Sequence, residues 1–66
     1  MSEPNVAELQ DLSQRALDAY WKAKDLNAAV VLLQEGIRRG RDSRDPEILG
    51  KVKAMAYNLA SFTWPG

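Results

Sequence analysis

The sequence predicts an all-α fold, a single domain over residues 1–66 with helices at about 5–24, 26–40 and 46–64. Apolar residues recur at three- and four-residue spacing through most of the chain, which is the period of amphipathic helices. Two polar breaks, at Asp25 and at Asp45-Pro46, divide this pattern into three segments. A chain of 66 residues makes one domain at most, with marginal stability.

The first helix begins at Asn5, three residues before Glu8, a spacing that lets both side chains pair with N–H groups of a first helical turn. Apolar or small side chains follow at helical spacing as far as Ala23. They are Val6, Leu9, Leu12, Ala16, Ala19 and Ala23, widened by Leu17 and Tyr20. This stripe predicts a helix over about 5–24.

The second helix begins after Asp25, a good N-cap, and carries a new apolar stripe from Leu26 to Ile37. The short polar turn before it requires the first two helices to fold back as an antiparallel hairpin. Gly36 and Gly40 mark its close. The apolar run 28–33 also has the composition of a buried strand, but it lies within the helical period and has no partner strand.

The third helix has the clearest start, since Asp45 supplies an N-cap, Pro46 suits the first helical position and Glu47 meets the helix dipole. Its stripe repeats at four, three, four and three residues: Ile48, Val52, Met55, Leu59 and Phe62. Pro65 disfavours helix at the residue before it, so we expect the end near Trp64. We expect Ile48, Val52, Met55 and Leu59 to pack on the hairpin.

The composition argues against catalysis. The chain has no cysteine and no histidine, which removes disulfides, thiolate nucleophiles and the usual zinc ligands. It contains neither a Gly-x-Ser-x-Gly turn nor a glycine-rich phosphate loop, and its acidic residues fall on predicted solvated faces. We therefore expect no enzyme activity, no cofactor and no metal site.

The charge pattern argues against nucleic acid and membrane partners. Nine basic and nine acidic residues give a formal net charge of zero. The N-terminus is acidic and polar, and no apolar run approaches the roughly 20 residues of a membrane span, so we expect a cytoplasmic protein.

Four arginines at 38, 39, 41 and 44 are compatible with a phosphate site, but Glu35, Asp42 and Asp45 lie among them, so a solvated connector explains the run better. DNA binding by a three-helix domain is disfavoured because the third helix carries only Lys51 and Lys53 as cations.

The first two helices resemble a tetratricopeptide repeat, whose pattern has a Trp, a Leu-Gly pair and a Tyr on its first helix and Ala, an aromatic residue and Ala on its second. When the pattern is aligned with this chain without a gap, its positions fall on Ser13, Ala16-Leu17, Tyr20, Ala29, Leu33 and Gly36. Tyr20 and Ala29 match the pattern, and Leu33 and Gly36 match in kind. Ser13 and Ala16-Leu17 depart from it, and the expected proline is displaced to Pro46. The resemblance covers about residues 12–40.

The third helix looks like the first helix of a following repeat, with Leu59-Ala60 in place of the Leu-Gly pair. The chain would then hold about one and a half repeats. Such repeats bury their faces by stacking on neighbours, so a missing half-repeat would leave an apolar face uncovered. Either the chain belongs to a longer helical array, or a second copy supplies the missing layer.

The resemblance implies a protein-binding role for the inner faces of the first and third helices. The implied residues are Gln14, Asp18, Trp21, Lys22, Tyr57, Ser61 and Trp64. Two interpretations of Trp21 and Trp64 stay open, contact with a bound peptide or packing against a neighbouring helix or dimer mate.

We further expect a homo-oligomer, most simply a two-fold dimer. Its interface would combine Met55, Leu59, Phe62 and Trp64, with Leu32 or Val31 as additions. The leading functional hypothesis is a protein–protein interaction module of tetratricopeptide-like hairpin type, and the alternative is a purely structural homodimerisation unit without a peptide ligand.

Overall fold

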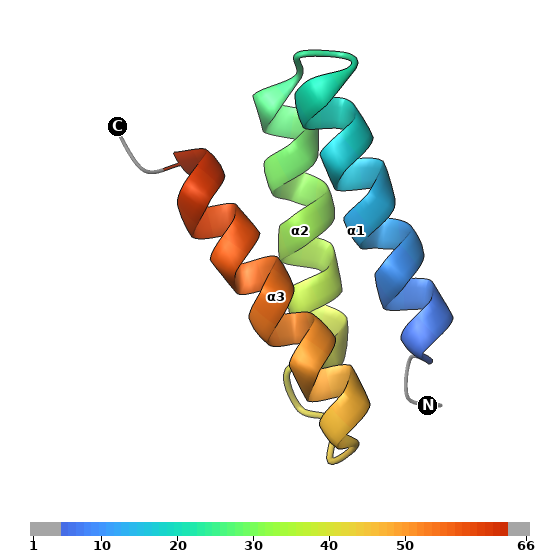
Figure 1. The fold of residues 1–66 in the computed structure, drawn as a ribbon. Helices are drawn as coiled ribbons and strands as arrows, with labels where there is room; N and C mark the ends of the chain where they lie inside the picture. The colour runs from blue at the N-terminus through green and yellow to red at the C-terminus, as the bar shows by residue number, and fades with distance from the viewer. Residues whose placement is uncertain (1–4, 64–66) are drawn as a thin grey trace.

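The computed structural model describes residues 5–63, which form three α-helices: α1 (Val6–Trp21), α2 (Leu26–Gly40) and α3 (Pro46–Thr63). No strand occurs among these residues, and the predicted all-α fold is confirmed. Figure 1 shows the helices running up, down and up again, with the α1–α2 turn at one end and the α2–α3 connector at the other. The start of α1 and the last described turn of α3 therefore lie toward opposite ends of the bundle.

Each helix starts where its predicted cap lies. Asn5, Asp25 and Asp45 stand immediately before α1, α2 and α3. Their Oδ1 atoms accept backbone N–H groups from Glu8, Ala28 and Glu47, at 2.8, 3.0 and 2.9 Å respectively. Each cap satisfies a donor that has no partner within its own helix, which fixes the start of that helix.

The end of α1 differs from the prediction, because the helix closes at Trp21 and not at residue 24. The N–H groups of Lys22 and Ala23 both donate to the Asp18 carbonyl, at 2.8 and 3.1 Å, so the last turn widens. Lys24 then takes a φ of 55°, the left-handed conformation that reverses the chain. The Asp25 N–H consequently reaches back to the Ala19 carbonyl at 2.8 Å.

The α2–α3 connector is ordered by Ser43, a polar side chain that is buried. Its Oγ accepts the Asp45 N–H at 3.0 Å, and its own N–H donates to the Gly40 carbonyl at 3.0 Å. This local turn sets Asp45 in place to cap α3. The helix is described as far as Thr63, and the expected end at Trp64 lies outside the described residues.

The core lies where α2 packs between α1 and α3. Its fully buried large side chains are Leu9 from α1, Leu33 from α2, and Ile48 and Met55 from α3. Val52 and Leu59 are partly buried against this cluster. The predicted packing of one α3 face on the hairpin is thus confirmed.

Two glycines on α2 allow α3 to approach closely. Gly36 and Gly40 are buried one helical turn apart, and a Cβ on Gly36 would stand 2.7 Å from Met55 Sδ. Gly40 ends α2 as predicted. Gly36 does not mark the close of the helix, because it lies inside α2 and serves the contact between helices.

Candidate functional site

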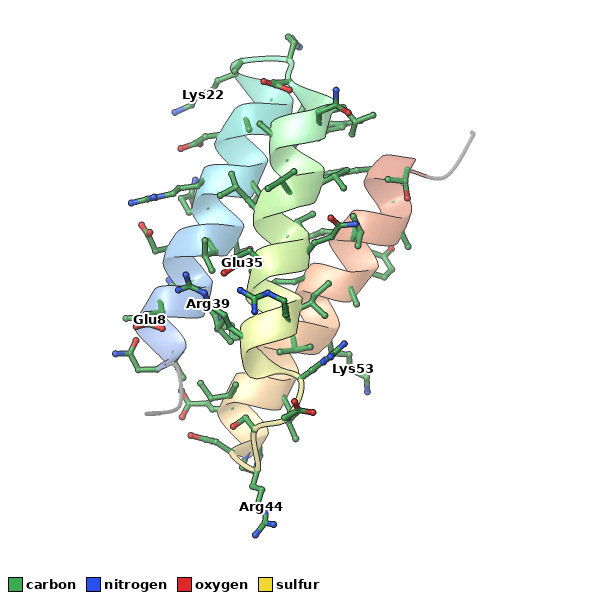
Figure 2. The ribbon with its side chains drawn as sticks, turned by 180° about the vertical axis from the view of Figure 1, so that it is seen from behind. Glu8, Lys22, Glu35, Arg39, Arg44 and Lys53 are labelled. Carbon is green, nitrogen blue, oxygen red and sulfur yellow. The ribbon has the colours of Figure 1, made fainter. Side chains whose placement is uncertain are left out.

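The residues predicted on α1 form a polar line along one side of the helix. Gln14 Nε2 donates to Asp18 Oδ1 at 3.2 Å, and Lys22 Nζ lies 3.7 Å from the same oxygen. Lys22 stands where α1 has just ended (Figure 2). Trp21 is next to it and 62% exposed. Gln14, Trp21 and Lys22 are exposed, and Asp18 is half-buried.

Three aromatic rings join the last turn of α1 to the last turn of α3. Tyr20 stacks on Phe62 with ring centroids 4.0 Å apart and planes 7° apart. Tyr20 also meets Trp21 edge to face, at a centroid distance of 4.9 Å. Trp21 is therefore oriented by its neighbour and still presents most of its indole to solvent.

The residues predicted on α3 are exposed on the helix surface. Tyr57 is 74% exposed, and Ser61 follows it by one helical turn on the same side of α3. Trp64 lies outside the described residues. The solvent-exposed parts of two helices thus carry the predicted groups, which are amide, carboxylate and amino groups on α1 and aromatic and hydroxyl groups on α3. The Tyr20–Phe62 stack connects these two helices.

The predicted oligomer interface requires a correction. Met55 is only 1% exposed and is covered by α2 at Gly36, while Leu59 packs on the core and Phe62 stacks on Tyr20. These side chains build the single chain, because three short helices must use their largest apolar stripes to make any core. Of the suggested additions, Val31 is exposed and Leu32 is partly buried against the core.

A second stripe on α3, which the sequence reading missed, is exposed. It follows the core stripe by one residue and repeats the same spacing of four, three, four and three: Leu49, Lys53, Ala56, Ala60 and Thr63. Lys53 provides its single charge, and Leu49 is 40% exposed. The repeated spacing in the sequence could have revealed this second stripe. It is easily overlooked because alanine and threonine carry little apolar area.

The N-terminal half of this stripe borders an open hollow on the surface of α3. Pro46, Leu49, Gly50, Val52 and Lys53 line it. Gly50 contributes no side chain, and a Cβ added there would meet no atom within 4 Å. Figure 2 shows Lys53 on α3, on the side away from α1.

The basic run at the end of α2 has its own counter-charge. Glu35 accepts bonds from Arg38 Nη2 at 2.7 Å and from Arg39 Nε at 2.8 Å. The hydrogen bonds from Arg38, which have the larger effect, and from Arg39 lower the pKa of the Glu35 carboxyl. Figure 2 shows Glu35 and Arg39 one turn apart on α2. This pairing agrees with the interpretation of the arginine run as a solvated segment.

Residues 5–63 contain no group of three or more acidic, His or Cys side chains placed to hold a metal ion. None of the helices described is long and apolar enough to cross a membrane.

Comparison with known proteins gives no family: no protein-family profile, no curated protein and no solved structure matches this chain significantly.

Proposed function

We propose that the chain is a protein–protein interaction module of tetratricopeptide-like hairpin type. The single observation that carries this proposal is the exposure of Trp21 and Tyr57, at 62% and 74%, on the two outer helices of one small domain. Aromatic side chains of this size are the usual anchors of protein interfaces, because each buries a large apolar area and also offers a polar group.

The neighbours of these aromatic side chains suit a peptide. Gln14, Asp18 and Ser61 offer donors and acceptors for backbone N–H and C=O groups, and Lys22 adds a cation beside Asp18. Such a mixture of aromatic anchors and polar groups, in which the charges of Asp18 and Lys22 offset each other, is typical of interfaces that bind without a large net charge. The proposed binding residues are therefore Gln14, Asp18, Trp21, Lys22, Tyr57 and Ser61.

The packing of α2 on α3 supports the tetratricopeptide-like part of the proposal. The family pattern expects a small residue at the place of Gly36, where two helices come close. Gly36 is buried against Met55 of α3. The short turn between α1 and α2 also agrees with the helical hairpin of such a repeat.

The proposal can be tested with a displayed library of random peptides, using the immobilised chain as bait. We expect enriched peptides that bind the wild-type chain with micromolar affinity and lose at least about tenfold in affinity with Trp21→Ala or Tyr57→Ala. Val31→Ala is the matched control, because Val31 is as exposed as Trp21 and belongs to α2. It should leave the affinity unchanged.

Two outcomes would contradict this function. Either no peptide is enriched over an empty support, or the enriched peptides bind the Trp21→Ala and Tyr57→Ala chains as well as the wild type. With either result, the alternative of a purely structural homodimerisation unit becomes the better account.

A further inference from the structure

We propose that a second copy of the chain covers the exposed stripe of α3, in a two-fold dimer whose α3 helices pack antiparallel about Ala56. The stripe consists of Leu49, Lys53, Ala56, Ala60 and Thr63. This surface differs from the one that carries Trp21, so the proposal goes beyond peptide binding and can fail independently of it.

The first argument is the composition of α3. Its core stripe is buried in the hairpin, and the stripe beside it exposes only apolar, small or hydroxyl side chains apart from Lys53. A helix with apolar residues on most of its circumference is normally covered on more than one side. In the described residues, nothing packs on this second side, because Leu49, Ala56 and Ala60 are all exposed.

The second argument is the spacing. A stripe that repeats at four and three residues is the pattern by which two helices interlock at a crossing angle of about 20°. Ala56 lies at the centre of the stripe, and Ala60 follows it by one helical turn. Both side chains are small, so two helix backbones can approach closely there. With 18 residues, α3 is about 27 Å long, enough for one such seam.

The third argument is charge complementarity, which favours a second copy in antiparallel orientation. The last turn of α3 contains no basic residue to meet the negative end of its helix dipole. With the two-fold axis at Ala56, each Lys53 lies opposite position 59 of the other α3, and each Leu49 lies opposite the partner's Thr63. Because helical side chains lean toward the N-terminus of their own helix, the Lys53 side chain extends toward the last turn of the other α3. The larger Leu49 of each chain then faces the smaller Thr63 of the other. This contact occurs twice, as the symmetry of a two-fold interface requires.

The two Lys53 side chains do not oppose this arrangement strongly. They lie three residues on either side of the axis, so their attachment points are about 9 Å apart along the helices. That separation is comparable to the screening length of about 8–10 Å at ordinary salt concentrations. A parallel pair would instead set the two Lys53 residues side by side and leave both negative helix ends together.

Sedimentation equilibrium over a concentration series from low micromolar to about 1 mM tests the dimer. The range is wide because an interface made by a single helix from each chain is small, and small interfaces usually belong to weak complexes. We expect wild-type chain to dimerise, and Ala56→Glu to raise the dissociation constant at least about tenfold through an unpaired charge in the seam. Ala54→Glu is the matched control, because Ala54 is also exposed on α3 but lies off the stripe. It should leave the dissociation constant unchanged.

Cysteine cross-linking tests the orientation without relying on affinity, because the chain has no cysteine of its own. Ala56→Cys should oxidise to a disulfide-linked dimer and Ala54→Cys should not. In a mixture of Leu49→Cys and Thr63→Cys chains, we expect the mixed dimer to dominate over the Leu49→Cys homodimer.

A monomeric wild-type chain at about 1 mM would overturn the proposal and leave a helix of another protein as the occupant of the stripe. Equal dissociation constants for Ala56→Glu and Ala54→Glu would also overturn it, since the seam would then lie elsewhere. Loss of peptide binding with an intact dimer refutes the proposed function alone, and a monomer that still binds peptides refutes the dimer alone.

Discussion

Gly40 of α2 lies directly against Val52 of α3, so closely that a Cβ on Gly40 would stand 2.6 Å from Val52 Cγ2. The same Cβ would stand 3.0 Å from Leu9 Cδ1 of α1 and 3.1 Å from Ile48 Cγ2 of α3. One missing methyl group therefore sets the distance between helices at the point where all three meet. Val52 and Ile48 are branched at Cβ, so neither methyl group can swing aside easily.

Gly40→Ala is expected to lower the free energy of unfolding by about 1–3 kcal/mol, because the added methyl group must push α3 away from α2. The change can be measured by urea denaturation with far-ultraviolet circular dichroism. Gly50→Ala is the matched control. Its Cβ would meet no atom within 4 Å, and alanine is the better helix former, so we expect a gain of about 0.5–1 kcal/mol. Equal stabilities for the two variants would mean that the contact at Gly40 is not close.

Asp45→Ala is expected to destabilise the chain by about 1 kcal/mol, because it removes the acceptor for the Glu47 N–H at the first turn of α3. The thermal midpoint provides the measurement. Asp42→Ala should have a much smaller effect, since Asp42 lies earlier in the same exposed connector and precedes no helix directly. If the two variants melt alike, the cap at Asp45 contributes nothing to the stability of α3.

Lys24→Gly is expected to stabilise the chain by up to about 1 kcal/mol. Lys24 has a φ of 55°, which costs a residue with a Cβ roughly 1–2 kcal/mol, and glycine loses only part of this gain to its greater freedom when unfolded. Lys22→Gly, at an ordinary φ of −91°, should instead be neutral or destabilising. Chemical denaturation of both variants checks the prediction, and a loss of stability with Lys24→Gly would contradict the left-handed turn.

The sequence predicted the starts of the helices well because their signals are local. Asn5, Asp25 and Asp45 each bond to an N–H group two or three residues ahead, so neighbouring residues alone determine the cap. The end of α1 was missed for the opposite reason. Ala23 fits the apolar stripe, whereas the left-handed turn falls on Lys24, a residue that carries no signal for it.

The candidate surfaces could be predicted only in part. Trp21 and Tyr57 are exposed. The face of α3 that packs on the hairpin was predicted correctly, but local periodicity did not show that this packing buries Met55 and leaves a second stripe exposed. Two stripes of equal spacing run along that helix. The stripe with Met55 became the core because its side chains bury more apolar area than those beside Ala56, and this comparison depends on the whole fold.

Acid should weaken the fold partly through Glu35. Its carboxylate accepts hydrogen bonds from Arg38 and Arg39 in the folded chain, and these hold its pKa below the ordinary value of 4.5. The unfolded chain therefore takes up this proton more readily than the folded chain. The stabilisation from Glu35 is then complete above a pH of about 4.5 and is lost as the pH falls through the lower pKa of the folded state.

Glu35→Gln removes the charge and thereby the linkage to pH. We expect the variant to be less stable than the wild type at neutral pH and the gap between them to shrink as the pH falls below about 4.5. Urea midpoints for both chains between neutral pH and about pH 2.5 measure this gap. High salt should narrow it at neutral pH, because the ion pairs are partly exposed to solvent. A gap that stays constant over the whole pH range would show that the arginines do not hold the Glu35 carboxylate in the folded chain.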